Sequence, residues 1–289
     1  MTRINTAIAE NAREPAAAAL WGLLFALLLG IGVGGCQAPP VGGAAGGTVT
    51  LQATPNTPHP NLEDQAQPQV PEEGIIAGRS VQNRPLGAIV LGDGPEVILM
   101  LASIHGSEPA GTPLLYELAT FLRHHPRYLD RRRVVLLLEA NPDGLAQGTR
   151  TNARGVDLNR NFPASNRVNS ARYGSAPLSE PEAAAIFDIL ERYAPARVVS
   201  IHQPLKCIDY DGPGLELATT MAASCSLPVR KLGARPGSLG AFVGLEQRIP
   251  IITLELPRGA SRLDGEQLFA AYGRALLAAI VHPALPDEE

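Results

Sequence analysis

Five short apolar runs, with segments of helical periodicity between or after them, constrain the fold of this chain more than any other feature. Strands are expected at 87–91, 97–101, 134–138, 198–201 and 249–254, and helices at 112–124, about 179–193 and 263–281. The second helix is expected to open with a capping box formed by Ser179 and Glu182. Strands that alternate with helices predict an α/β domain of three layers (α/β/α), with a mixed, mostly parallel central sheet.

The first 75 residues differ in composition from the rest of the chain. An apolar run at 16–35 ends in small residues immediately before Cys36, which favours a signal peptide with a lipobox over residues 1–36 and acylation of Cys36. The run is also long enough for an uncleaved membrane anchor, so both alternatives stay open. Residues 37–75, rich in Pro, Gly and Thr, are expected to form a flexible tether. Residues 76–285 would then be a globular domain outside the cytoplasmic membrane, attached to it by a lipid or an anchor.

Charge and cysteine content narrow the function further. The formal net charge is −4, so the chain lacks the basic character that nucleic-acid binding requires. If Cys36 is acylated, Cys207 and Cys225 remain. An oxidising compartment permits a disulfide between them, and two free thiols are the alternative.

Polar side chains follow several of the expected strands, at the point where each strand ends. His105 and Glu108 follow the run at 97–101, His202 follows the next run but one, and Glu255 lies in the last strand. Because the carboxyl ends of parallel strands meet at one edge of a sheet, we expect these side chains to converge. Two imidazoles and one carboxylate form a ligand set of catalytic zinc sites. His105, Glu108 and His202 are therefore predicted to bind one Zn²⁺ ion per chain.

Zinc lowers the pKa of a bound water to about 7, which provides a nucleophile at neutral pH. Glu255 is then the expected general base, which takes the proton of this water and passes it to the leaving amine. Arg150 can stabilise an oxyanion, and Asn159 and Arg160 can hold a substrate carboxylate. Asp157 lies between these residues, and either hydrogen bonding within its own loop or support of the metal site would explain it.

Together these features resemble the zinc carboxypeptidase family over about residues 97–258. The motifs that carry the resemblance are the His-x-x-Glu loop, an arginine followed by Asn-Arg, a single histidine after a strand and a glutamate in a late strand. Segments 141–144, 148–163 and 237–240 further resemble the small bacterial branch of murein peptide amidases. The resemblance implies a zinc carboxypeptidase-like fold, and cleavage of the γ-D-glutamyl–meso-diaminopimelate bond in cell-wall peptides.

The resemblance assigns the same roles to the same residues: zinc ligands to His105, Glu108 and His202, the oxyanion contact to Arg150, the carboxylate contacts to Asn159 and Arg160, and the base to Glu255. Leu239 falls where the family places its specificity residue, and Arg235 flanks the expected cleft. Three alternatives stay open. They are a zinc carboxypeptidase for α-linked peptides, a deacylase of the aspartoacylase type, and a catalytically inactive lipoprotein that binds cell-wall peptides.

Overall fold

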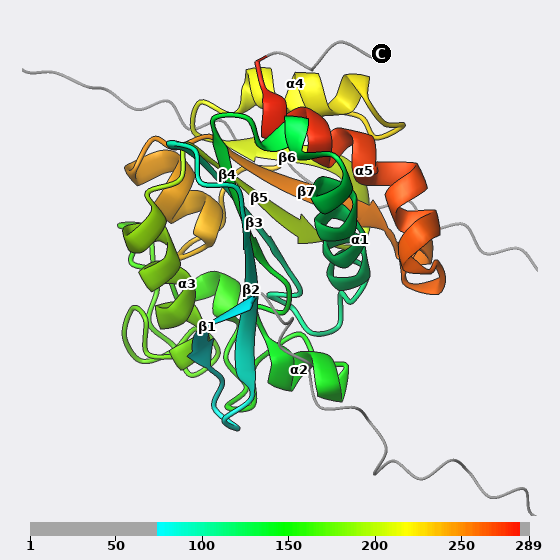
Figure 1. Ribbon diagram of the computed structural model, residues 1–289. Coiled ribbons are helices and arrows are strands. Elements are labelled where there is room, and N and C mark those ends of the chain that lie inside the picture. The colour runs from blue at the N-terminus through cyan, green and yellow to red at the C-terminus, as the bar shows by residue number, and fades with distance from the viewer. Residues whose placement is uncertain (1–73, 284–289) are drawn as a thin grey trace, which may run out of the picture. The chain divides into compact units, whose positions relative to one another are not determined.

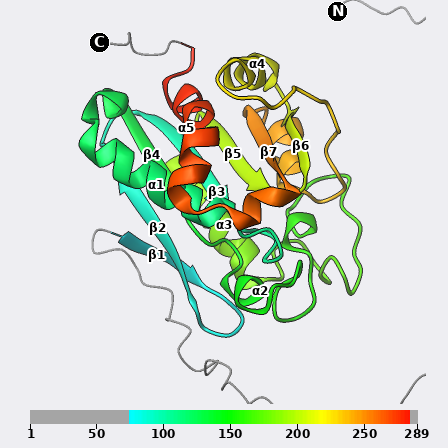
Figure 2. The ribbon, with the colours of Figure 1, turned by 90° about the vertical axis from the view of Figure 1, so that its right-hand side faces the viewer.

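A seven-stranded mixed sheet runs through residues 74–283, the part of the chain that the computed structural model describes (Figures 1 and 2). Its strands are β1 (Gly74–Arg79), β2 (Pro85–Leu91), β3 (Glu96–Ala102), β4 (Arg132–Leu137), β5 (Arg197–His202), β6 (Leu205–Asp211) and β7 (Ile251–Pro257). Their order is β1-β2-β4-β3-β5-β7-β6. The central strands β4, β3, β5 and β7 are parallel, and the outer strands pair antiparallel. The predicted three-layer α/β/α fold with a mixed, mostly parallel sheet is confirmed.

Helices cover both faces of the sheet. They are α1 (Gly111–His124), α2 (Pro142–Gln147), α3 (Pro181–Tyr193), α4 (Leu215–Ala223) and α5 (Gly265–Val281). Figure 1 shows α3 on one side of the sheet and α1 and α5 on the other. Apolar residues of α1, α4 and α5 pack into one core cluster, whereas α3 and the π-helix Gly240–Glu246 contribute to the second.

Strand β3 shows why the central strands are uninterrupted apolar runs. Ile98 and Met100 belong to the cluster beneath α1 and α5, whereas Val97, Leu99 and Leu101 belong to the cluster beneath α3. Successive side chains of a strand point to opposite faces, and here both faces are covered by helices. Every position must therefore be apolar.

The helix starts differ in one respect from the expectation. The capping box predicted at Ser179 and Glu182 is wrong: α3 has Glu180 at its N-cap, and no side chain caps it. The Ser179 hydroxyl instead donates to the Glu180 carboxylate, and Glu182 accepts hydrogen bonds from two other segments of the chain. A capping box does open α5, between Asp264 and Gln267.

Further predictions concern the N-terminal segment and the cysteines. The signal peptide, Cys36 and nearly all of the tether lie outside the described residues and stay predictions. Within residues 74–283, no helix combines the length and the apolar character needed to cross a membrane. Cys207 and Cys225 are both free thiols, which agrees with the second of the two alternatives for this pair.

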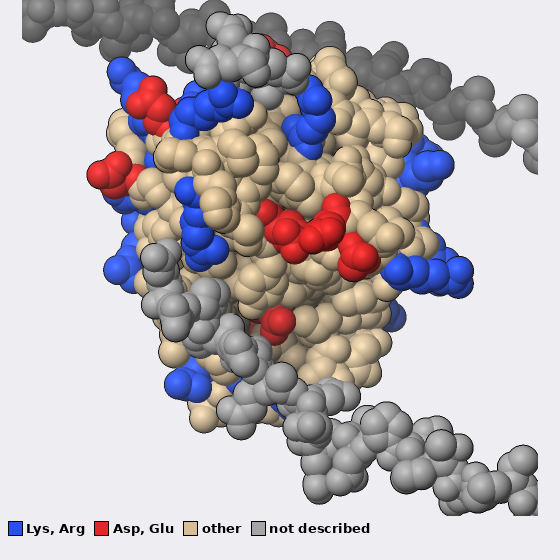
Figure 3. Space-filling view, turned by 45° about the vertical axis from the view of Figure 1, so that its right-hand side comes forward, with Lys and Arg blue, Asp and Glu red and all other residues tan. Residues whose placement is uncertain are grey.

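The surface drawn in Figure 3 carries charges of both signs. Acidic side chains gather near the middle of this face, and Lys and Arg side chains lie mostly toward its edges. That the chain does not bind nucleic acid stays an expectation from its net charge.

Candidate active site

The candidate site lies at the carboxyl ends of β3, β5 and β7. In the sheet, β3 lies between β4 and β5, the next two strands in the chain. The strand order therefore reverses at β3, which leaves a crevice beside its carboxyl end. His105 and Glu108 lie in the loop that follows β3, and His202 is the last residue of β5. Glu255 of β7 is directly paired in register with His202. Strands separated in the sequence thus bring these four side chains to one crevice.

The loop after β3 is shaped by two residues with different roles. The backbone turns at Ser103, which is buried and has a φ of 54°. Gly106 serves a close approach: a Cβ at this position would lie 1.9 Å from the carbonyl carbon of Gly144 in α2. Only glycine allows the loop to pack so closely on α2. The amide of Glu108 then donates to the carbonyl oxygen of His105 at 3.0 Å, which closes the turn between the two candidate ligands.

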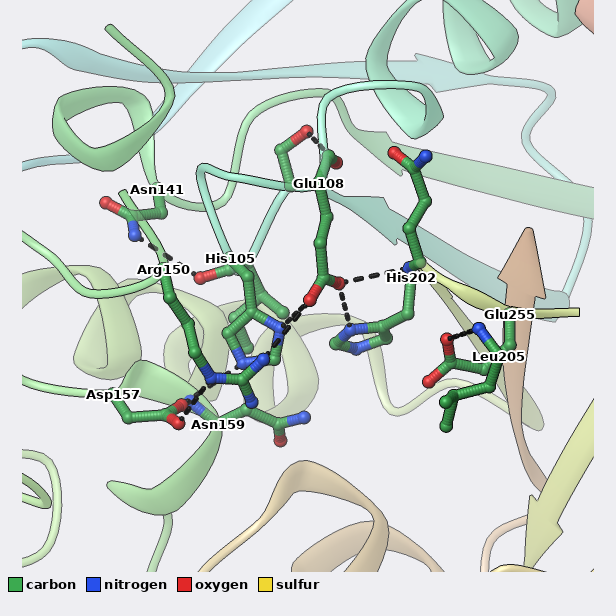
Figure 4. A network of polar contacts seen from close by, with 12 residues as sticks. His105, Glu108, Asn141, Arg150, Asp157, Asn159, His202, Leu205 and Glu255 are labelled. Atoms are coloured by element: carbon green, nitrogen blue, oxygen red, sulfur yellow. Dashed lines mark hydrogen bonds and ion pairs between the residues drawn. The ribbon is translucent and has the colours of Figure 1, made fainter. Parts of the chain in front are cut away.

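The three candidate metal ligands face one another (Figure 4). Glu108 Oε1 lies 3.0 Å from His105 Nδ1, and Glu108 Oε2 lies 2.9 Å from His202 Nδ1. One donor atom from each residue lies within 4.8 Å of the other two, and all three side chains are buried. The site is therefore a compact set of two imidazoles and one carboxylate.

Asp157 fixes the orientation of His105. Its Oδ1 lies 3.1 Å from His105 Nε2, and its Oδ2 accepts a hydrogen bond from Arg150 Nε at 3.0 Å. A neutral imidazole that donates from Nε2 to Asp157 has only a lone pair at Nδ1. His105 Nδ1 is buried, has no partner with hydrogen-bond geometry, and faces a carboxylate oxygen of Glu108. A lone pair opposite a carboxylate is repulsive unless a cation lies between them.

This arrangement fits a zinc ion. Zinc sites use imidazole nitrogens and carboxylate oxygens, and a histidine ligand commonly donates its other ring nitrogen to a carboxylate. His105, Glu108 and His202 provide the donors, and Asp157 provides the supporting carboxylate. The orphaned Nδ1 of His105 is the observation that a bound cation explains.

The pKa values in the site reflect burial opposed by hydrogen bonds and charges. Burial raises the pKa of the Glu108 and Asp157 carboxyls, but the two histidines around Glu108, and His105 and Arg150 beside Asp157, outweigh it and lower both pKa values. For His105, burial lowers the pKa, but the hydrogen bond to Asp157 and the negative charges of Glu108 and Asp157 raise it above its usual value. Burial raises the pKa of Glu255, only partly opposed by His202 and by the backbone amide of Leu205.

Arg150, Asn159 and Arg160 lie on the same side of the site. Arg150 Nη1 donates to Glu108 Oε1 at 3.2 Å, so its guanidinium lies beside the candidate metal ligands. The backbone amide of Asn159 donates to Asp157 at 3.1 Å, and the Asn159 side chain accepts from the amide of Leu239 at 2.9 Å. The Arg160 guanidinium contacts the carbonyl oxygen of Asn159.

These residues open onto a pocket of about 260 Å³. Its wall includes the three candidate ligands and Glu255, the basic residues Arg150, Arg160 and Arg235, and also Asp209, Asp211, Ser238, Gly240 and Thr253. Arg235 thus lines the same pocket as the candidate ligands. Leu239 does not line this pocket: its side chain is buried in the core cluster beneath α3, and its backbone amide holds Asn159.

Two residues of the site have roles that the sequence left open or did not indicate. Both alternatives for Asp157 hold, because it accepts from an amide of its own loop and also contacts His105. The sequence pattern indicates no role for Gln203. Its amide donates to Glu108 Oε2 at 3.1 Å, and its position directly after His202 is the signal that could have found it.

Comparison with known proteins agrees with this geometry. A model of the zinc carboxypeptidase family matches residues 64–210. Murein peptide amidase A of Escherichia coli (strain K12) is 38% identical over 196 residues, which is 62% of this chain and 78% of that protein. The gamma-D-glutamyl-L-diamino acid endopeptidase 1 of Lysinibacillus sphaericus is 26% identical over 262 residues, 71% of this chain and 65% of that protein.

Among solved structures, the murein-tripeptide amidase from Escherichia coli O157 superposes with a TM-score of 0.56 at 31% sequence identity. The match covers 77% of this chain and 96% of that one. The similarity therefore extends over nearly the whole of the solved protein.

Proposed function

The chain belongs to the zinc carboxypeptidase family and is a zinc peptidase, and from this premise we propose that it hydrolyses an amide bond in cell-wall peptides. The bond we propose is the one between the γ-carboxyl group of D-glutamate and meso-diaminopimelate. Two of the relatives above carry names that point to this substrate class, one a murein peptide amidase and the other a γ-D-glutamyl-diamino acid endopeptidase.

The observation that carries the substrate proposal is the mixture of charges in the pocket. Arg160 and Arg235 line it with cations, and Asp209 and Asp211 line it with carboxylates. Diaminopimelate on the leaving side of the bond carries carboxylates and a free ammonium group. A pocket with both signs of charge complements such a residue, and a purely apolar pocket would not.

Arg160 and Asn159 are suited to hold the main-chain carboxylate of the leaving residue. A guanidinium binds a carboxylate through paired hydrogen bonds, and an amide adds a further donor. Arg150 lies beside Glu108 and can donate to the carbonyl oxygen as negative charge develops on it. Zinc held by His105, Glu108 and His202 supplies a Lewis acid, which polarises the carbonyl and lowers the pKa of a water molecule.

Glu255 is the residue we propose to move the proton. It is buried, lies beside His202 in the sheet and is held by the amide of Leu205 at 3.2 Å. Its Oε2 accepts that hydrogen bond, and the carboxylate can still take a proton from the attacking water. Passing this proton to the leaving amine completes the hydrolysis.

We also propose that the enzyme works outside the cytoplasmic membrane, anchored through Cys36. The sequence around Cys36 supports this proposal, because small residues precede the cysteine after an apolar core. A tether over residues 37–75 would give the catalytic domain reach into the cell wall. Lipid labelling of the intact protein distinguishes an acylated Cys36 from an uncleaved anchor.

The test of the substrate proposal compares two peptides. Purified zinc-loaded protein is offered L-Ala-γ-D-Glu-meso-diaminopimelate and an α-linked peptide with an ordinary C-terminal residue, and the released amine is followed. We expect faster release of diaminopimelate from the γ-linked peptide. Faster release from the α-linked peptide would contradict the proposal and favour an ordinary carboxypeptidase.

A further inference from the structure

We propose that a second pocket beside the metal centre binds the free α-carboxylate of the γ-linked glutamyl residue, with Arg258 as its cationic partner. The inference rests on the proposed function and extends it to the acyl side of the scissile bond. The pocket has a volume of about 250 Å³ and is lined by Ser107, Glu108, Gln203, Pro204, Arg258 and Ser261. It shares Glu108, Gln203 and Pro204 with the main pocket, so the two pockets meet at the metal site.

Gln203 ties this second pocket to the metal loop. Its Oε1 accepts from the amide of Ala110 at 3.1 Å, and its Nε2 donates to the Ser261 hydroxyl at 3.0 Å. Its backbone amide donates to Glu108. Ser261 lies in the 3-10 helix Arg258–Arg262, so one buried glutamine joins that helix to the loop that carries two of the candidate ligands. The backbone of the 3-10 helix that carries Arg258 is therefore tied to the metal loop through Gln203.

Arg258 is the cation of this pocket, and it is available to a ligand. It follows Glu255 by three residues, just beyond the end of β7. The residue is exposed, and within residues 74–283 its guanidinium has neither an ion pair nor a side-chain hydrogen bond. The pocket's carboxylate, that of Glu108, is engaged by the two histidines. Ser107 adds a hydroxyl group that can donate to an anion, whereas the Ser261 hydroxyl already donates to the carbonyl oxygen of Arg258 at 3.4 Å.

The direction of the substrate follows from the two pockets. Arg160 and Arg235 line only the first pocket, where the leaving residue would bind. The scissile carbonyl must lie near Arg150 and the candidate ligands. The acyl part of the substrate would then pass Glu108 into the second pocket, which shares Glu108, Gln203 and Pro204 with the first.

The chemistry of the γ-linkage supplies the anion. In a γ-glutamyl peptide the α-carboxylate stays free, separated from the scissile carbonyl by a short methylene chain. In an α-linked peptide the main-chain carboxyl of the acyl residue is itself the scissile carbonyl, so no free main-chain carboxylate remains at that residue. An unpaired guanidinium on the acyl side therefore favours the γ-linked substrate over the α-linked one.

The experiment crosses two enzymes with two substrates. The substrates are L-Ala-γ-D-Glu-meso-diaminopimelate and the same peptide with γ-aminobutyrate in place of D-glutamate, which keeps the linkage and lacks only the carboxylate. The enzymes are the zinc-loaded wild type and Arg258→Gln. The matched control is Arg262→Gln, a change of the same kind in the same 3-10 helix, at an exposed arginine that does not line the pocket.

We expect Arg258→Gln to lower kcat/KM by about 10- to 100-fold on the glutamyl peptide, as loss of a hydrogen bond between charged groups does. On the γ-aminobutyryl peptide the loss should be less than about threefold, and Arg262→Gln should behave as the wild type on both. An equal loss on both peptides, or no loss on either, would overturn the inference while the proposed function stands. If the zinc-loaded wild type cleaves neither peptide, the proposed function fails, and the inference fails with it. Unfolding temperature and zinc content of each variant show that it is folded and loaded.

Discussion

Replacement of Asp157 by Asn tests how the metal site is held. Asp157 accepts from His105 Nε2 through one oxygen and from Arg150 Nε through the other, at 3.1 and 3.0 Å. An asparagine has one acceptor oxygen, so its NH₂ group must face one of these two donors. Loss of the carboxylate also removes the charge that makes His105 a stronger ligand. Loss of such a supporting group costs about 10- to 100-fold in metal affinity, which corresponds to about 1.4 to 2.8 kcal/mol.

The assay is competition for zinc against a chelator of known affinity, with thermal unfolding as a second readout. At a zinc concentration well above both dissociation constants, the stabilisation by zinc should fall by the same free energy, which lowers Tm by about 3 to 11 °C in a domain of this size. Asp188→Asn is the control, because Asp188 is exposed on α3, away from the site. Zinc affinity equal to that of the control would refute the role assigned to Asp157.

Three further predictions concern the base, the pH profile and the anchor. Glu255→Gln should bind zinc normally and lose about 100-fold or more in turnover, because the amide cannot take a proton. Unchanged turnover would show that another residue is the base. Burial raises the pKa of Glu255, and activity requires its ionised form. The acid limb of kcat/KM should therefore lie above the usual glutamate range, with activity falling as pH falls through the raised pKa; a limb at or below that range would contradict this. Cys36→Ser in the full chain should abolish lipid labelling and leave the precursor unprocessed, whereas normal processing at another position would exclude the lipobox.

The central strands could be predicted because both of their faces are buried. The runs around Val97–Leu101 and Val134–Leu138 are apolar without interruption, and a strand covered by helices on both faces leaves that pattern. Strands β1 and β6 were missed because they are edge strands. The β6 segment contains Lys206, Asp209 and Asp211, and these polar residues interrupt the apolar run that would have indicated a strand.

The positions of the polar clusters were predictable because they follow strand ends, where an open parallel sheet forms its sites. The contacts between them were not. The distance from Asp157 to His105, or from Gln203 to Glu108, depends on how loops pack, and no periodicity in the sequence records it. The specificity role that the family resemblance gave to Leu239 shows what a motif cannot predict. The motif places the residue next to the pocket wall, but packing directs its side chain into the core.

Zinc content measured together with activity is the most direct test of this account. We predict one zinc ion per chain in the wild-type protein, loss of γ-glutamyl hydrolysis on chelation, and recovery when zinc is added back. His202→Ala should bind zinc weakly and remain inactive at a zinc concentration that restores the wild type. Full activity of metal-free His202→Ala protein would contradict the assignment of His105, Glu108 and His202 as the ligands of a catalytic zinc ion.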